Sequence, residues 1–260
     1  MLIRALRNTR DGLLSLAYPQ HCRLCGNPVE SWDDGVVCRE CWEDTSVTTL
    51  FLDLPACRKC GAPIEIGETA LTFEHSNERY CGLCAHLPFS FARSCGAYTG
   101  ALEASVLFLK SEPFICPRLR RILSETYLSH QPVLGSDLVL AVPLHRLRER
   151  ERGFNQSRVI AKFIASRFGL AFDDSALARL KQTARHRAGF DAGDRAKSVE
   201  RAFAVTQPRK ISGVSVLLID DLYTTGSTVS AATLALLNAG AASVCVMTIA
   251  RAVRSEFLHR

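Results

Sequence analysis

The feature that most constrains this chain is a group of eight cysteines between residues 22 and 84, arranged as four C-x-x-C pairs. Two residues between cysteines let both sulfurs of a tight turn face one metal ion, and two such turns complete the tetrahedral four-sulfur shell of a structural Zn²⁺ site. The sequence therefore predicts two closed, structural zinc ions. The predicted ligands are Cys22, Cys25, Cys38, Cys41, Cys57, Cys60, Cys81 and Cys84.

The spacing leaves the pairing of the four turns open. Gaps of 12 residues between Cys25 and Cys38 and of 20 residues between Cys60 and Cys81 suit two zinc ribbons built from sequential pairs. Interleaved pairing, in which the first turn shares an ion with the third, is also compatible with the spacing. Disulfides and iron–sulfur ligation use the same thiols, although disulfides are rare in the reducing cell interior.

The N-terminal segment does not resemble a secretory signal, because Arg4, Arg7 and Arg10 interrupt its apolar residues. Leucines at three- and four-residue spacing predict instead a short amphipathic helix over residues 1–20. No stretch of about 18 consecutive apolar residues occurs, so no transmembrane helix is expected. We expect a cytoplasmic protein without membrane insertion, in which the cysteines stay reduced.

Charge divides the chain at the same place as cysteine. Residues 1–95 carry 9 basic and 12 acidic side chains, whereas residues 96–260 carry 23 and 14, within an overall net charge of +6. Excess positive charge favours polyanion binding, which places the expected ligand surface in the second part. The sequence predicts a double zinc ribbon over residues 21–90 and a larger domain over residues 96–260.

A second motif lies in that larger domain. Residues 216–219 are apolar and predict a buried parallel strand, and residues 229–237 predict a helix. Between them come Asp220 and Asp221 and then a hydroxyl-rich loop, at the strand end where open α/β sheets bind ligands. The loop consists of Thr224, Thr225, Gly226, Ser227 and Thr228. Loop N–H groups and the helix N-terminus suit a phosphate, and carboxylates accept hydrogen bonds from sugar hydroxyls, so ribose 5-phosphate satisfies both halves.

This motif resembles the phosphoribosyl pyrophosphate (PRPP) motif of type I phosphoribosyltransferases over 13 consecutive residues, with Tyr223 in place of the usual aliphatic residue. The resemblance implies an α/β domain whose parallel sheet carries helices on both faces. It also implies that Asp220 and Asp221 are the catalytic carboxylates that hold the ribose hydroxyls, and that residues 224–228 hold the 5-phosphate. Mg²⁺ would accompany PRPP.

A second expected strand, residues 137–142, ends at Pro143 and runs into the arginine-rich segment 146–152. At a ligand-binding sheet edge such a segment suits a pyrophosphate, and the alternative is a solvated basic loop that begins a helix. The arginines alternate, so they cannot all face one point. The pyrophosphate-binding candidates are His145, Arg146, Arg148 and Lys110.

The four C-x-x-C pairs, the R-x-R-G-F-N-Q segment at 150–156 and the D-D-L-Y-T-T-G-S-T segment at 220–228 together resemble the ComF family of competence-associated proteins. The resemblance covers almost the whole chain. It implies a role in DNA uptake during natural competence or in DNA processing, with DNA-uptake proteins and single-stranded DNA as partners. The basic segment 177–203 is then either a lid that closes over pyrophosphate or an exposed loop.

The sequence favours a PRPP-binding protein related to phosphoribosyltransferases, with structural zinc, that acts in DNA uptake or processing. Two alternatives stay open. One is an active phosphoribosyltransferase with an unidentified base or amine acceptor. The other is a single-stranded nucleic-acid-binding protein that stacks bases on Phe154 or Phe190. No residue stands out as a general base, so the sequence decides neither turnover nor the acceptor.

Overall fold

The computed structural model describes residues 19–44, 56–64, 70–72, 79–82, 84–180 and 202–253. Residues 1–18 of the helix expected over residues 1–20, and most of the basic segment 177–203, lie outside these ranges.

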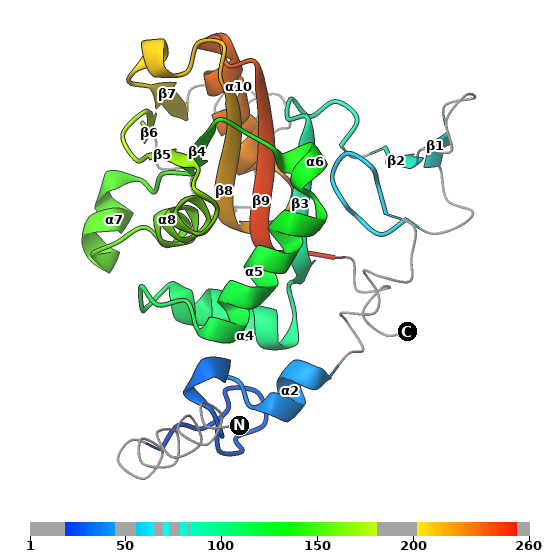
Figure 1. The fold of residues 1–260 in the computed structure, drawn as a ribbon, viewed down its shortest axis with the longest axis vertical. Helices are drawn as coiled ribbons and strands as arrows, with labels where there is room; N and C mark the ends of the chain where they lie inside the picture. Colours follow the sequence, from blue (N-terminus) through cyan, green and yellow to red (C-terminus); the bar gives the residue numbers. More distant parts are fainter. Residues whose placement is uncertain are drawn as a thin grey trace, which may run out of the picture.

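A five-stranded parallel sheet forms the centre of the described chain, in the order β3-β9-β8-β4-β5 (Figure 1). Its strands are β3 (Phe91–Ala97), β4 (Leu138–Ala141), β5 (Ala171–Asp173), β8 (Ser215–Tyr223) and β9 (Ser243–Arg251). The register of β8 with β9 runs from Ser215 opposite Ser243 to Tyr223 opposite Arg251. The central strand β8 is longer than the sequence predicts, because it continues through the two carboxylates at 220 and 221 instead of ending before them.

Three helices cover one face of the sheet. They are α4 (Gly100–Leu109), α5 (Pro117–Ser129) and α8 (Gln156–Phe168). Their apolar residues recur one helical turn apart, as in Leu119 and Leu123 of α5 and Ile160 and Ile164 of α8, and all four are buried with Leu217 of the sheet. Shorter helices, α6 (Gln131–Leu134) and α7 (Arg146–Arg152), lie before and after β4 in the chain.

Helix α10 (Ser227–Asn238) covers the opposite face, where Val229, Ala232 and Leu236 share a core with Leu218 and Val246. The same core includes residues of an antiparallel strand pair, β6 (Leu177–Arg179) and β7 (Phe203–Val205). The short 3₁₀ helix η2 (Pro208–Lys210) follows β7. The predicted parallel sheet with helices on both faces is confirmed, with α5 and α6 in front of the sheet and α10 behind it in Figure 1.

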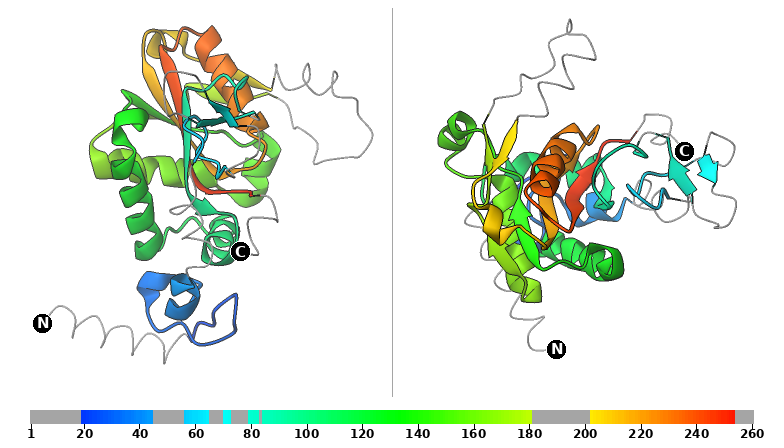
Figure 2. Two further views of the ribbon diagram at one scale, coloured as in Figure 1. Left: turned by 90° about the vertical axis from the view of Figure 1, so that its right-hand side faces the viewer. Right: turned by 90° about the horizontal axis from the view of Figure 1, so that it is seen from above.

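The first ribbon, residues 19–44, lies at the end of the molecule far from α10 (Figures 1 and 2). It contains the short 3₁₀ helix η1 (Trp32–Asp34) and the short α-helix α2 (Arg39–Glu43). Val37 and Cys38 share a small core with Ala104 of α4.

The second ribbon, the described residues between 56 and 88, packs beside β3 and α10. It contains the antiparallel strands β1 (Ala70–Thr72) and β2 (Arg79–Cys81). Its first turn is held by Arg93 of β3, whose guanidinium donates to the carbonyl oxygens of Arg58 and Lys59. Among the described helices, none has the length and apolar character needed to cross a membrane.

Candidate functional site

Two adjacent carboxylates lie at the end of β8, in the middle of the sheet. Asp220 and Asp221 are 8% and 7% exposed. Successive side chains of a strand point to opposite faces. Leu218 accordingly belongs to the core beneath α10 and Ile219 to the core beneath α8, but Asp220 and Asp221 both contact the start of α8. The sheet edge therefore presents both carboxylates to the start of α8.

The first residues of α8 hold both carboxylates. Ser157 Oγ donates to Asp220 Oδ1 at 2.8 Å, and Gln156 Nε2 donates to Asp221 Oδ2 at 3.2 Å. Gln156 and Ser157 were not among the site residues that the sequence predicted. The available signal was a pair of polar residues at the start of a helix whose other inward positions are apolar, since buried polar groups require partners.

Asn155 ties this helix start to the neighbouring strand. Its Oδ1 accepts a hydrogen bond from the Ser157 N–H at 3.0 Å, which caps α8, and its Nδ2 donates to the Val142 carbonyl oxygen at 3.0 Å. Gly153, with φ of 78°, ends α7 just before this cap. The sequence G-F-N-Q-S therefore joins the ends of β4 and β8 at one edge of the sheet.

Cations surround the acidic pair. Lys110 Nζ, just after α4, lies 3.6 Å from Asp221 Oδ2. Burial and the neighbouring Asp221 charge raise the pKa of Asp220 to about 7, although hydrogen bonds to its carboxylate and the charge of Arg179 act in the opposite direction. Burial lowers the pKa of Arg179, which feels both the acidic charge of Asp220 and the positive charge of Arg148. Perturbed groups of both signs thus meet at one strand end, as is typical of binding sites.

The arginine-rich segment forms a helix, α7, where the sequence left a basic loop or a helix start open. Arg148 and Arg152 are half-buried one turn apart, whereas Arg146 and Arg150 are exposed. Arg152 Nη1 donates to Gln156 Oε1 at 2.9 Å, so this arginine supports the residue that holds Asp221.

The four pyrophosphate candidates are placed differently. Lys110 contacts Asp221 directly, and Arg148 is half-buried, with its positive charge acting on Arg179. His145 begins α7, where its Nδ1 accepts the Leu147 N–H at 3.4 Å. Arg146 is exposed.

The predicted phosphate loop joins β8 to α10. Thr224, Thr225 and Ser227 are exposed, Thr228 is half-buried and Gly226 is buried. Gly226 has φ of +79°, and a Cβ built there would lie 2.6 Å from the Tyr223 hydroxyl, so only glycine fits without rearrangement. The Thr225 and Ser227 hydroxyls lie 2.7 Å apart. The first N–H groups of a helix lack intrahelical acceptors, so this exposed loop can donate to an anion.

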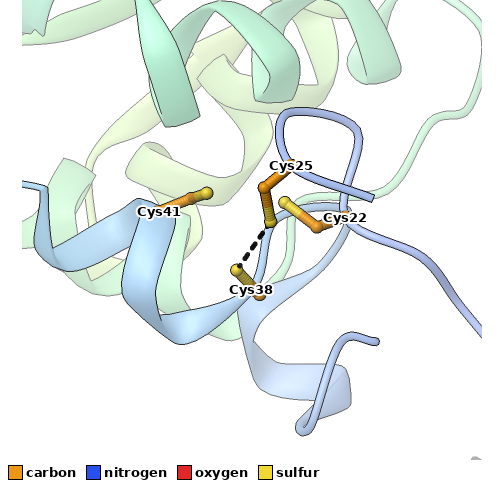
Figure 3. Close-up of side chains that lie close together, drawn as sticks. All are labelled: Cys22, Cys25, Cys38 and Cys41. Atoms are coloured by element: carbon orange, nitrogen blue, oxygen red, sulfur yellow. Dashed lines mark hydrogen bonds between the residues drawn. The ribbon is translucent and has the colours of Figure 1, made fainter. Parts of the chain in front are cut away.

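The cysteines of the first ribbon form one four-sulfur group. Figure 3 shows Cys22, Cys25, Cys38 and Cys41 converging, and their Sγ atoms all lie within 4.8 Å of one another. Burial disfavours the Cys22 thiolate, but backbone N–H groups outweigh burial and lower the pKa of Cys22 to about 6, which favours metal binding.

The second ribbon forms an equivalent group from the other two turns. Cys57 Sγ lies 3.4 Å from Cys84 Sγ, and Cys60 Sγ lies 3.6 Å from Cys81 Sγ. Zn–S bonds of about 2.3 Å imply sulfur separations of roughly 3.8 Å in a tetrahedron. Both thiol sets therefore fit zinc, and the turns pair sequentially rather than interleaving.

Comparison with known proteins agrees with this arrangement. Residues 13–85 match the family model described as a double zinc ribbon domain. DNA utilization protein YhgH of Salmonella typhi is 33% identical over 178 residues, which cover 66% of this chain and 77% of that protein. Competence protein ComFC of Bacillus subtilis is 33% identical over 119 residues, which cover 44% of each chain.

Among solved structures, glutamine PRPP amidotransferase from B. subtilis, complexed with ADP and GMP, is similar with a TM-score of 0.38 and 20% identity, over 55% of this chain and 30% of that chain. The relationship to the YhgH proteins extends over most of their length and is accompanied by the double zinc ribbon. On these grounds the chain belongs to the ComF family.

Proposed function

We propose that the site at the end of β8 binds PRPP through its ribose 5-phosphate group, and that the protein uses this ligand in DNA uptake or DNA processing. The observation that carries the proposal is the position of the buried Asp220–Asp221 pair directly before the loop 224–228. A phosphate requires N–H donors and a sugar requires acceptors. A sugar phosphate requires both within the length of one ligand.

The acidic pair supplies oriented acceptors for the sugar. Among the described residues, side-chain and backbone donors reach Oδ1 of Asp220 and Oδ2 of Asp221, which leaves one oxygen of each carboxylate for a ligand hydroxyl. Gln156 and Ser157 fix the two carboxylates before the ligand arrives, so less side-chain entropy is lost on binding. This geometry supports recognition of two neighbouring hydroxyls, as on ribose.

The surrounding cations suit the pyrophosphate of PRPP. We assign this role to Lys110, which contacts Asp221, and to Arg148, whose charge acts on Arg179 as that of Asp220 does. Roles for His145 and Arg146 stay predictions. Carboxylate and phosphate oxygens are the ligands that Mg²⁺ prefers, so the donor chemistry fits this ion near Asp220 and Asp221. When bound, Mg²⁺ would neutralise pyrophosphate charge.

The names of the relatives support the biological setting. They are a DNA utilization protein and competence proteins. We therefore propose single-stranded DNA and DNA-uptake proteins as partners. Release of pyrophosphate from PRPP in the presence of a base or an amine would additionally make the protein a phosphoribosyltransferase.

Isothermal titration calorimetry of PRPP with Mg²⁺ into the wild type and an Asp220→Asn/Asp221→Asn variant tests the proposal. We expect the double variant to bind at least about 100-fold more weakly, because two charge-assisted hydrogen bonds of about 1.5 to 3 kcal/mol each are weakened.

A charge-matched control uses two exposed glutamates, in a Glu40→Gln/Glu112→Gln variant, and should bind like the wild type. Undetectable binding to the wild type, or equal affinity of the wild type and the aspartate variant, would refute the proposed site.

A further inference from the structure

The second ribbon lies directly against the proposed phosphate loop. Cys60 and Cys84 belong to the same buried cluster as Tyr223, the last residue of β8, and Val229, in the first turn of α10. These two residues flank the loop 224–228 on either side. Metal ligands and the residues on either side of the proposed phosphate loop therefore share one core.

Arg251 forms the first link between them. It is the last residue of β9 and is 7% exposed, and its Nη1 donates to the Cys60 carbonyl oxygen at 2.5 Å. Its guanidinium also lies over the Tyr223 ring, 4.9 Å from the centroid. A zinc ion with four thiolate ligands carries a net negative charge, which complements a buried guanidinium.

The loop packs at Gly226 against two side chains, those of Tyr223 and Leu87. A Cβ at Gly226 would lie 2.6 Å from the Tyr223 hydroxyl and 3.1 Å from Leu87 Cδ1. The Leu87 N–H donates to the Cys84 carbonyl oxygen at 3.1 Å, and the Leu87 carbonyl oxygen accepts from Lys59 Nζ at 2.6 Å. Lys59 and Cys84, one from each metal-binding turn of the second ribbon, thus position Leu87 beneath Gly226.

The first ribbon has the same metal chemistry but a different location. Its Asp34 pairs with Arg118 of α5 at 3.0 Å, and Arg118 lies over the Trp42 ring. In Figure 1 this ribbon lies beside α4, at the opposite end of the molecule from α10. It provides an internal control for any effect that is specific to the second ribbon.

We propose that metal occupancy of the second ribbon controls the affinity of the phosphate loop, with Arg251 and Tyr223 as positioning residues. The inference rests on the proposed function, because it takes loop 224–228 to be the phosphate site. Metal binding orders the cysteine turns of a zinc ribbon. Without the metal, the carbonyl groups of Cys60 and Cys84 are no longer fixed, and Tyr223 and Leu87 lose the contacts that hold Gly226 in place.

Two full-length variants test this inference, Cys57→Ser/Cys60→Ser in the second ribbon and Cys22→Ser/Cys25→Ser in the first. We expect each variant to lose the zinc of its own ribbon. The second-ribbon variant should bind PRPP with Mg²⁺ about tenfold or more weakly, equivalent to one charge-assisted hydrogen bond, whereas the first-ribbon variant should bind within about twofold of the wild type. Equal effects of the two variants would overturn the inference.

Substitution of Arg251 keeps the test decisive if the second-ribbon variant fails to fold. Arg251→Met should retain both zinc ions yet bind PRPP about tenfold more weakly, and Arg251→Lys should restore part of the affinity because it keeps the charge. Retained zinc with wild-type affinity in Arg251→Met would reject the link.

Hydrogen exchange of the peptide covering residues 223–230, measured without ligand, separates this inference from the proposed function. Faster exchange in the second-ribbon variant alone supports the coupling even if the wild type binds no PRPP, a result that rejects only the function. If the second-ribbon variant exchanges at the wild-type rate and the wild type binds PRPP, only the coupling is rejected. Unchanged exchange without binding rejects both.

Discussion

At the scale of single residues, Asp220 is held in an environment that opposes its charge. It is 8% exposed and adjacent to a second carboxylate, and burial together with Asp221 raises the pKa of Asp220 from 3.8 to about 7. A folded-state pKa above the unfolded value means that the native state binds the proton more tightly. Stability contributed by the protonated group is therefore lost as the pH rises from about 4 through about 7. Burying this carboxylate therefore costs folding free energy at neutral pH, as is typical of binding sites.

Asp220→Asn should remove this cost while its Oδ1 still accepts hydrogen bonds from Ser157 and the Asp221 N–H. We expect the variant to match the wild type near pH 4 and to become more stable than it as the pH rises past about 7, by up to about 4 kcal/mol. Urea unfolding at several pH values measures the difference. Glu112→Gln, at an exposed position, should stay within about 0.5 kcal/mol at every pH. A variant that is less stable than the wild type at pH 8 would show that the charged carboxylate supports the fold.

At the scale of elements, the turn from β8 into α10 depends on one glycine. Gly226 has φ of +79° and lies against Tyr223. Gly169, which ends α8, has φ of +66°, but a Cβ built there would meet nothing within 4 Å. The two glycines therefore separate backbone strain from close packing.

Gly226→Ala should weaken both stability and PRPP binding, whereas Gly169→Ala should affect stability alone. Each substitution costs roughly 1 kcal/mol through its left-handed backbone conformation, and overpacking against Tyr223 should add about 1 to 3 kcal/mol at Gly226. Urea unfolding and PRPP titration measure the two effects. If both variants lose the same stability and both bind PRPP, close packing does not shape the loop.

The elements around the site were largely predictable from sequence. Strands buried on both faces appear as continuous apolar runs, which is why residues 137–142 and 216–219 predicted β4 and the core of β8. The continuation of β8 through Asp220 and Asp221 was not predictable, since local pattern assigns charged residues to loops. Those carboxylates are buried because α4 and α8, distant in sequence, bring Lys110 and the N-Q-S segment to them.

At the scale of the whole molecule, the first ribbon is attached through a buried ion pair. Asp34 and Arg118 are 3.0 Å apart, with side chains 10% and 17% exposed. The chain contains two tryptophans, Trp32 and Trp42, and both belong to this ribbon. Tryptophan fluorescence therefore reports on the ribbon alone.

Arg118→Ala should loosen the first ribbon, because it leaves the buried Asp34 carboxylate without its partner, at a cost of roughly 3 kcal/mol. We expect tryptophan emission to shift to longer wavelength while PRPP affinity stays unchanged. Arg121→Ala is the matched control on the same helix, since its side chain is 65% exposed. Unchanged emission in Arg118→Ala would show that other contacts attach the ribbon.

The sequence predicted two zinc ions but not the separation of the two ribbons. Cysteine spacing defines how each metal is bound, because the ligands are local. The position of each ribbon against the larger domain depends on a few residue pairs far apart in sequence, such as Asp34 with Arg118 and Cys60 with Arg251. No periodic sequence pattern marks such pairs. The functional difference that we propose between the ribbons depends on this separation.

The proposed site must bind both a sugar and its phosphate, and titration calorimetry with ribose 5-phosphate and 2-deoxyribose 5-phosphate tests this requirement most directly. We predict that the deoxy sugar binds about tenfold more weakly, because one hydroxyl-to-carboxylate hydrogen bond is lost. The difference should disappear in Asp220→Asn/Asp221→Asn. Equal affinity of the wild type for the two sugars would contradict the role of the acidic pair and leave only a phosphate-binding loop.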